Sequence, residues 1–143
     1  LPRAIRDVYK RQGEGVSPLR LKTVATAVFT RPEIAAVGFT QAEIENGDVA
    51  ARTITMPLST NPRAKMRSLR HGFVKLFCRQ TSGRVIGGVV VAPTASELIL
   101  PIAVAVTNQL TVNQLADSFA VYPSLSGTIT EAARRLVAHD DLE

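Results

Sequence analysis

The sequence has little of three residue types on which many functional sites depend. Its 143 residues include one cysteine, two histidines and no tryptophan. The single Cys78 excludes an internal disulfide and a cysteine-rich zinc site, and its place within an expected strand indicates a small core residue. His71 and His139 have no ligand spacing to another histidine, cysteine or carboxylate cluster, so we expect no metal site. A reducing, cytoplasmic setting fits this composition.

Long apolar runs are missing as well. The longest, residues 98–106, is about half the ~20 residues that a membrane helix requires, and it contains Pro101. No apolar stretch follows the basic N-terminus as it would in a signal peptide. A composition of 45% hydrophobic and 20% charged residues fits one globular domain with a modest core. We expect no membrane span.

The formal net charge of +5 comes mostly from one end of the chain. Residues 1–12 hold four basic residues and one acidic one, and without them 13 basic residues face 11 acidic ones, a net charge of +2. The basic stretch Arg63, Lys65, Arg67 and Arg70 could meet the phosphates of a nucleic acid or a nucleotide. It has no interleaved aromatic residues, so we favour a solvated loop and expect no nucleic-acid partner.

Residues 1–16 differ from the rest of the chain. They show no clear periodicity, and residues 6–12 (RDVYKRQ) resemble a translated sequencing-adaptor remnant more than natural protein. The pair Gly13 and Gly15 has neither the third glycine nor the following helix of a dinucleotide-binding loop. We therefore treat 1–16 as a possibly artefactual N-terminal segment, 17–138 as one domain and 139–143 as an acidic tail.

Hydrophobic patterning predicts an α+β domain. We expect strands at 23–30, 49–58, 73–79 and 84–92, with a hairpin turn at 81–83 and a short apolar passage at 34–38. Residues 84–92 are nearly all apolar, which predicts a central strand covered on both faces. Within it, Gly87 and Gly88 indicate close packing of the backbone.

Helix signals lie between the expected strands. Thr40 and Glu43 form a capping box for a short helix that ends at 46–48, and one helical turn is expected at 62–66. Ser96 is expected to cap a helix running to about residue 109 and bent at Pro101. This helix is apolar nearly all round, which predicts contact with a partner subunit. Thr111 is expected to cap a further helix at 112–117.

The stretch 119–136 combines a corner with a helix. Pro123 fixes its own φ and favours an extended backbone at Tyr122. Ser124 or Ser126 can cap the helix that follows, whose apolar face repeats at helical spacing: Ile129, Ala132, Ala133 and Leu136. Such a corner can carry chemistry, but residue types alone favour a plain turn.

Five segments nevertheless follow a familiar order. They are 28–38 (VFTRPEIAAVG), 72–76 (GFVKL), 83–87 (GRVIG), 95–99 (ASELI) and 122–126 (YPSLS). Together they resemble the C-terminal dimerisation domain of the pyridine nucleotide-disulphide oxidoreductases, over residues 17–138. The resemblance implies an antiparallel β-sheet flanked by α-helices, a homodimer, and two upstream domains that bind FAD and NAD(P)H.

Two positions depart from the family pattern His-Pro-Thr-x-x-Glu. Tyr122 stands where the family has its acid–base histidine, and Gly127 stands where the family has the glutamate that orients it. A tyrosine, with a reference pKa of about 10, is a poor general base at neutral pH. The pattern is similar to actinobacterial members of the family that act as NAD(P)H:quinone reductases. By this resemblance, Tyr122 would line the acceptor pocket at the partner subunit's FAD, and Pro123 would direct its carbonyl at the isoalloxazine.

The resemblance thus predicts part of an FAD-dependent NAD(P)H oxidoreductase that passes electrons to a quinone-like acceptor. The fragment by itself is not expected to be active. One alternative is a fragment of a disulfide reductase similar to dihydrolipoamide dehydrogenase, with another residue in place of the dyad. Another alternative is a non-catalytic dimerisation module.

Overall fold

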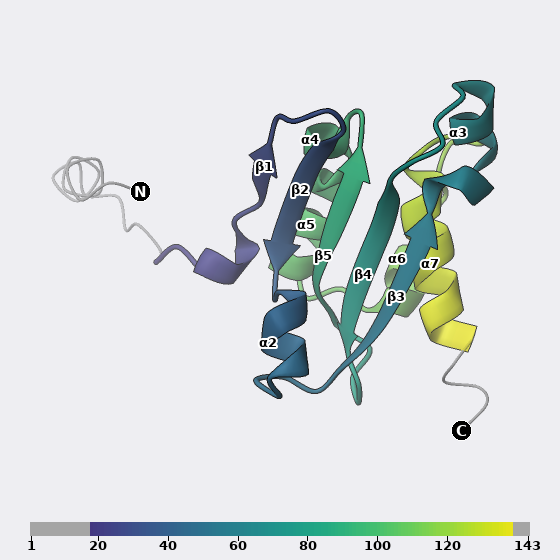
Figure 1. Ribbon diagram of the computed structural model, residues 1–143. Coiled ribbons are helices and arrows are strands. Elements are labelled where there is room, and N and C mark those ends of the chain that lie inside the picture. The colour runs from purple at the N-terminus through teal and green to yellow at the C-terminus, as the bar shows by residue number, and fades with distance from the viewer. Residues whose placement is uncertain (1–17, 139–143) are drawn as a thin grey trace, which may run out of the picture.

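The structure is a computed structural model that describes residues 18–138 (Figure 1). The segment 1–16 and the tail 139–143, with His139, lie outside the described residues. The described part is an α+β fold built on one five-stranded antiparallel sheet, as predicted. The strand order is β1-β2-β5-β4-β3, so β5 is the middle strand.

The five strands are β1 (Thr26–Val28), β2 (Glu33–Gly38), β3 (Ala51–Pro57), β4 (Phe73–Arg79) and β5 (Val85–Ala92). The predictions for β3, β4 and β5 are confirmed to within two residues at either end. The expected strand 23–30 is reduced to β1, because a 3₁₀ turn, η1 (Leu21–Thr23), occupies its start. The apolar passage 34–38 is itself strand β2, which pairs β1 on one side and β5 on the other.

The central strand β5 is buried along most of its length, as its apolar composition predicts. Its two glycines allow neighbouring backbone to approach closely. A Cβ atom added at Gly87 would lie 2.8 Å from the Val37 carbonyl oxygen, and one at Gly88 would lie 2.8 Å from the Lys75 carbonyl oxygen. No side chain fits within such distances, so both positions require glycine.

Most helices cover one face of the sheet (Figure 1). They are α4 (Ala95–Leu98), α5 (Leu100–Thr107), α6 (Val112–Ala116) and α7 (Gly127–Ala138). The main core lies beneath them and includes Val74, Leu76 and Cys78 of β4. The other face carries a smaller cluster, in which Ile44 of α2 (Gln41–Glu45) packs with Phe77 and Ile86. Two elements remain, η2 (Leu58–Thr60) and α3 (Pro62–Met66), and α3 matches the predicted turn.

The predicted capping box at Thr40 and the predicted cap at Thr111 are both confirmed. The Thr40 hydroxyl accepts a hydrogen bond from the Glu43 N–H, and the Glu43 carboxylate accepts one from the Thr40 N–H. Thr111 and Gln114 form the equivalent pair at the start of α6. Each box satisfies two backbone donors that a helix start otherwise leaves unpaired.

The prediction that Ser96 caps one helix to residue 109 is wrong. Its N–H and hydroxyl both donate to the Glu33 carboxylate of β2, at 2.9 and 2.7 Å. These bonds lower the pKa of Glu33 from its ordinary value. The helix is also divided at Ile99 into α4 and α5, because Pro101 has no N–H to continue the ladder. Ser96 therefore binds a carboxylate on a distant strand instead of capping its own helix, as the local sequence had indicated.

Helix α5 is apolar on its exposed side as well as its buried side. Ile102 and Ala105 are buried in the core, whereas Leu100 and Val104 are 63% and 44% exposed. An exposed apolar face on a helix is typical of a surface that meets another protein. The described residues include no helix long and apolar enough to cross a membrane.

Candidate functional site

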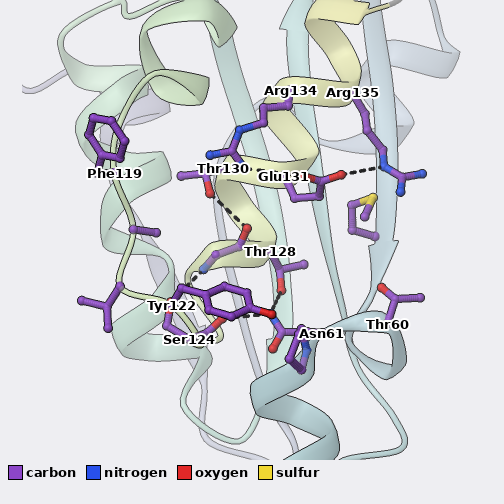
Figure 2. A pocket seen from close by; sticks show the side chains of 15 residues that line it. Thr60, Asn61, Phe119, Tyr122, Ser124, Thr128, Thr130, Glu131, Arg134 and Arg135 are labelled. Atoms are coloured by element: carbon purple, nitrogen blue, oxygen red, sulfur yellow. Dashed lines mark hydrogen bonds and ion pairs between the residues drawn. The ribbon is translucent and has the colours of Figure 1, made fainter.

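A pocket of about 390 Å³ lies where the segment 119–124 passes between α3 and α7 (Figure 2). Both positions that depart from the family pattern, Tyr122 and Gly127, line it. The remaining lining residues are Met56, Thr60, Asn61, Pro62, Phe119, Ala120, Val121, Ser124, Thr128, Thr130, Glu131, Arg134 and Arg135. The structure therefore brings together the two site positions that the sequence singled out.

Asn61 ties the two walls of the pocket together. Its Oδ1 accepts hydrogen bonds from the N–H groups of Arg63 and Ala64, at 2.8 and 3.1 Å, and so caps α3. Its Nδ2 donates to the Ser124 carbonyl at 2.9 Å and to the Thr128 hydroxyl at 2.7 Å. One buried side chain thus fixes α3 against the start of α7.

Tyr122 lies at the mouth of the pocket and is 82% exposed. The peptide bond between Tyr122 and Pro123 is cis, and the chain bends at both residues. An X–Pro bond adopts the cis form far more readily than other peptide bonds do. The tyrosine ring is largely exposed but lies close to Ser124 and Asn61 (Figure 2).

Helix α7 begins directly after this corner, at Gly127. The Ser124 hydroxyl accepts a hydrogen bond from the Gly127 N–H at 3.1 Å and lies 3.0 Å from the Ser126 hydroxyl. Of the two serines considered as caps, Ser124 makes the contact. The predicted apolar face of the helix is confirmed, since all four of its residues are buried: Ile129, Ala132, Ala133 and Leu136.

Gly127 is not required by packing. A Cβ atom added there would meet only the Ser124 Oγ, at 3.6 Å, which is an ordinary van der Waals distance. The position would therefore accept a side chain, and the pocket is open where the family pattern has a glutamate. The absence of a side chain at Gly127 leaves room in the pocket.

Charged residues form the far wall of the pocket, and sequence reasoning missed them. The Glu131 carboxylate accepts a hydrogen bond from Arg135 Nε at 3.2 Å and lies 3.5 Å from Arg134 Nη1. These three residues have i, i+3 and i+4 spacing, which places them on one side of α7. That spacing was the available signal, but only the fold shows that these partly exposed side chains line the same pocket as Tyr122.

The remaining polar candidates lie elsewhere. Arg63, Lys65, Arg67 and Arg70 are exposed around α3, as expected of a solvated loop. Arg70 and His71 line a second cavity of about 650 Å³ with Arg31 and Phe29. The described residues contain no group of three histidine, cysteine or acidic side chains that could hold a metal ion.

Comparison with known proteins matches residues 24–133 to the family model described as pyridine nucleotide-disulphide oxidoreductase, dimerisation domain. An NAD(P)H dehydrogenase (quinone) from Mycobacterium tuberculosis is 72% identical over 136 residues, covering 95% of this chain and 28% of the relative. A mercuric reductase from Shigella flexneri is 37% identical over 120 residues, 84% of this chain and 21% of the relative. The chain therefore spans between a fifth and a third of these relatives' length.

Solved structures give the same result. The crystal structure of LpdA from Mycobacterium tuberculosis superposes with a TM-score of 0.87 at 72% identity, covering 91% of this chain and 28% of that one. The flavoprotein disulfide reductase RclA from Escherichia coli superposes with a TM-score of 0.80 at 23% identity, covering 90% of this chain and 30% of that one. At that identity the second likeness shows the fold alone.

Proposed function

Because the chain belongs to the pyridine nucleotide-disulphide oxidoreductase dimerisation-domain family, we propose that it forms part of an FAD-dependent NAD(P)H oxidoreductase whose acceptor is quinone-like. One observation carries the choice of acceptor: Tyr122 and Gly127, at the two dyad positions, line the same pocket. We propose that the domain spans residues 17–138 and that the protein acts in the cytoplasm.

The chemistry of the acceptor explains why the dyad can be absent. The overall reaction would take a hydride from NAD(P)H and a proton from solvent, reduce a quinone to a hydroquinone by two electrons, and release NAD(P)⁺. A quinone oxygen can take its protons from water, whereas a disulfide reductase needs an acid–base group that transfers protons to and from thiolates. A tyrosine phenol is protonated at neutral pH and so offers a hydrogen bond rather than a base.

The residues of this chain would serve the acceptor side of the reaction. FAD, held mainly by an upstream domain, would supply two-electron transfer between NAD(P)H and the acceptor. The exposed ring of Tyr122 fits a contact with a planar ring system that another subunit presents, because nothing in the described residues covers it. Its hydroxyl would donate a hydrogen bond to the acceptor, and Pro123 would lie against the isoalloxazine.

A homodimer would complete this site. The exposed apolar side of α5, formed by Leu100 and Val104, would pack against the same domain of a second subunit. Tyr122 of one subunit would then meet the FAD of the other. The relative at 72% identity, which is named for quinone reduction, supports the proposal.

A second candidate is disulfide reduction. Relatives named mercuric reductase and dihydrolipoyl dehydrogenase are 37% and 36% identical to this chain. An upstream pair of redox cysteines separated by four residues, together with turnover of a disulfide, would favour it. A protein with no flavin domain would instead favour the non-catalytic dimerisation module.

The test uses the full-length natural protein and follows NAD(P)H oxidation with menadione or with a disulfide. We expect bound FAD, quinone turnover and no disulfide turnover. Tyr122→Phe should lower kcat/KM for the quinone about two- to tenfold, because it removes one hydrogen bond and keeps the ring. Thr60→Val, which also removes a hydroxyl from the pocket lining, is the matched control. An unchanged Tyr122→Phe would make Tyr122 a packing residue only.

A further inference from the structure

We propose that the pocket selects acceptors that join a planar ring to an acidic group such as a carboxylate or sulfonate. The inference rests on the proposed reduction of a quinone-like acceptor and names its chemical class. Its basis is the lining of the pocket, which combines the aromatic and apolar segment 119–122 with two arginines of α7.

The apolar part of the pocket lining is the segment 119–122. Phe119, Val121 and Tyr122 are all exposed at the rim of the pocket. Three exposed large apolar side chains within four residues form a surface that water solvates poorly. A planar ring laid against the tyrosine or the phenylalanine would cover them by stacking, at the geometry that aromatic pairs favour.

The charged part of the pocket lining is formed by α7. Glu131, Arg134 and Arg135 are the pocket's acidic and basic lining residues, and they sum to a formal charge of +1. The Glu131 carboxylate lies between the two guanidinium groups. It accepts a hydrogen bond from Arg135 Nε and forms an ion pair with Arg134 Nη1. A guanidinium has five N–H donors, so each arginine keeps donors for a second anion.

The length of α7 between the corner and the arginines suits a small ligand. Arg134 follows Gly127 by seven residues, which is about 10 Å along an α-helix. Figure 2 shows Tyr122 and Asn61 near the start of α7, and Arg134 and Arg135 further along it on either side of Glu131, with Phe119 level with Arg134. A bicyclic ring beside Tyr122 would therefore bring a substituent on its far edge to the arginines.

The uncharged polar groups that line the pocket already form hydrogen bonds within the domain. The Asn61 amide binds the Thr128 hydroxyl and the Ser124 carbonyl, and the Thr130 hydroxyl donates to the Gly127 carbonyl at 3.0 Å. The arginines consequently carry the electrostatic preference of the pocket. Their side chains are 52% and 59% exposed, so solvent weakens the attraction without abolishing it.

The experiment compares two acceptors on the full-length protein: 1,4-naphthoquinone-2-sulfonate and uncharged menadione. For Arg134→Gln and Arg135→Gln, we expect KM for the sulfonate to rise about two- to fivefold each, the size of an exposed ion pair. KM for menadione should not change. Arg79→Gln, an exposed arginine at the β4–β5 turn outside the pocket, is the control for net charge. Added salt should raise KM for the sulfonate alone.

A binding measurement separates this inference from the proposed reaction. Naphthalene-2-sulfonate has no quinone group and so cannot accept electrons from the enzyme. Calorimetry on the full-length protein should show that its affinity falls about fivefold or more when both arginines are replaced. If neither quinone is reduced but this loss is seen, quinone reduction fails and the ligand class stands. Equal losses for both acceptors, or no loss in either assay, would overturn the inference.

Discussion

Asn61 joins the two walls of the pocket, because its side chain forms hydrogen bonds both to α3 and to residues at the start of α7. Replacing it with alanine removes the cap of α3 and both bonds to the start of α7. A lost N-cap costs about 1 kcal/mol. Each lost hydrogen bond of a buried amide costs about 1 kcal/mol. We therefore expect Asn61→Ala to lower the free energy of unfolding by about 3 kcal/mol, or the Tm by about 10 °C.

Asn61→Ser separates the two roles of the side chain. Serine is as good an N-cap as asparagine, so α3 keeps its cap, but its side chain is too short to reach the Ser124 carbonyl. The expected loss is therefore about 2 kcal/mol, from the two bridging bonds alone. Asn113→Ala is the control, because Asn113 is exposed on α6 and its removal should change the stability by less than about 0.5 kcal/mol.

Urea unfolding followed by far-UV circular dichroism measures all three variants. Equal m-values would show that the same surface is exposed on unfolding, so the midpoints can be compared directly. If Asn61→Ala unfolds within 0.5 kcal/mol of the unmodified protein, Asn61 does not join the walls of the pocket. If Asn61→Ser has the same free energy of unfolding as the unmodified protein while Asn61→Ala does not, only the cap of α3 stabilises the fold. The two bonds to the start of α7 would then contribute nothing measurable.

Two further variants test other parts of the fold. Gly88→Ala should lower the free energy of unfolding by about 1–3 kcal/mol, because its Cβ would lie 2.8 Å from the Lys75 carbonyl oxygen. Gly127→Ala, which has space, should be neutral, and equal effects in thermal melts would contradict this packing argument. The Lys22 ammonium lowers the pKa of Glu43 to about 2 from its ordinary 4.5. That stabilisation is complete above pH 4.5 and lost as the pH falls toward 2. Glu43→Gln should therefore flatten the decline of Tm across this range, and parallel declines would exclude the ion pair.

Local signals in the sequence were sufficient for much of the fold. The alternation of residues 73–79 placed β4, and the helical turn at 62–66 was also placed to the residue. The capping box at Thr40 was readable because both partners lie within four residues of each other. The sequence was less informative for β2, where a run of six residues gives no clear period until its pairing with β5 is known.

The sequence by itself determined the α+β class and the resemblance to the family, and it led to the proposal that Tyr122 and Gly127 stand at the two dyad positions. Each of these depends on residue type and on spacing along the chain, which are fixed before folding. Tertiary structure alone decided that Asn61 reaches from α3 to α7 and that Ser96 binds Glu33, since both contacts join residues 63 positions apart or more. It also placed Arg134 and Arg135 in the lining of the same pocket as Tyr122. Such contacts follow from how helices pack on the sheet, which no local pattern encodes.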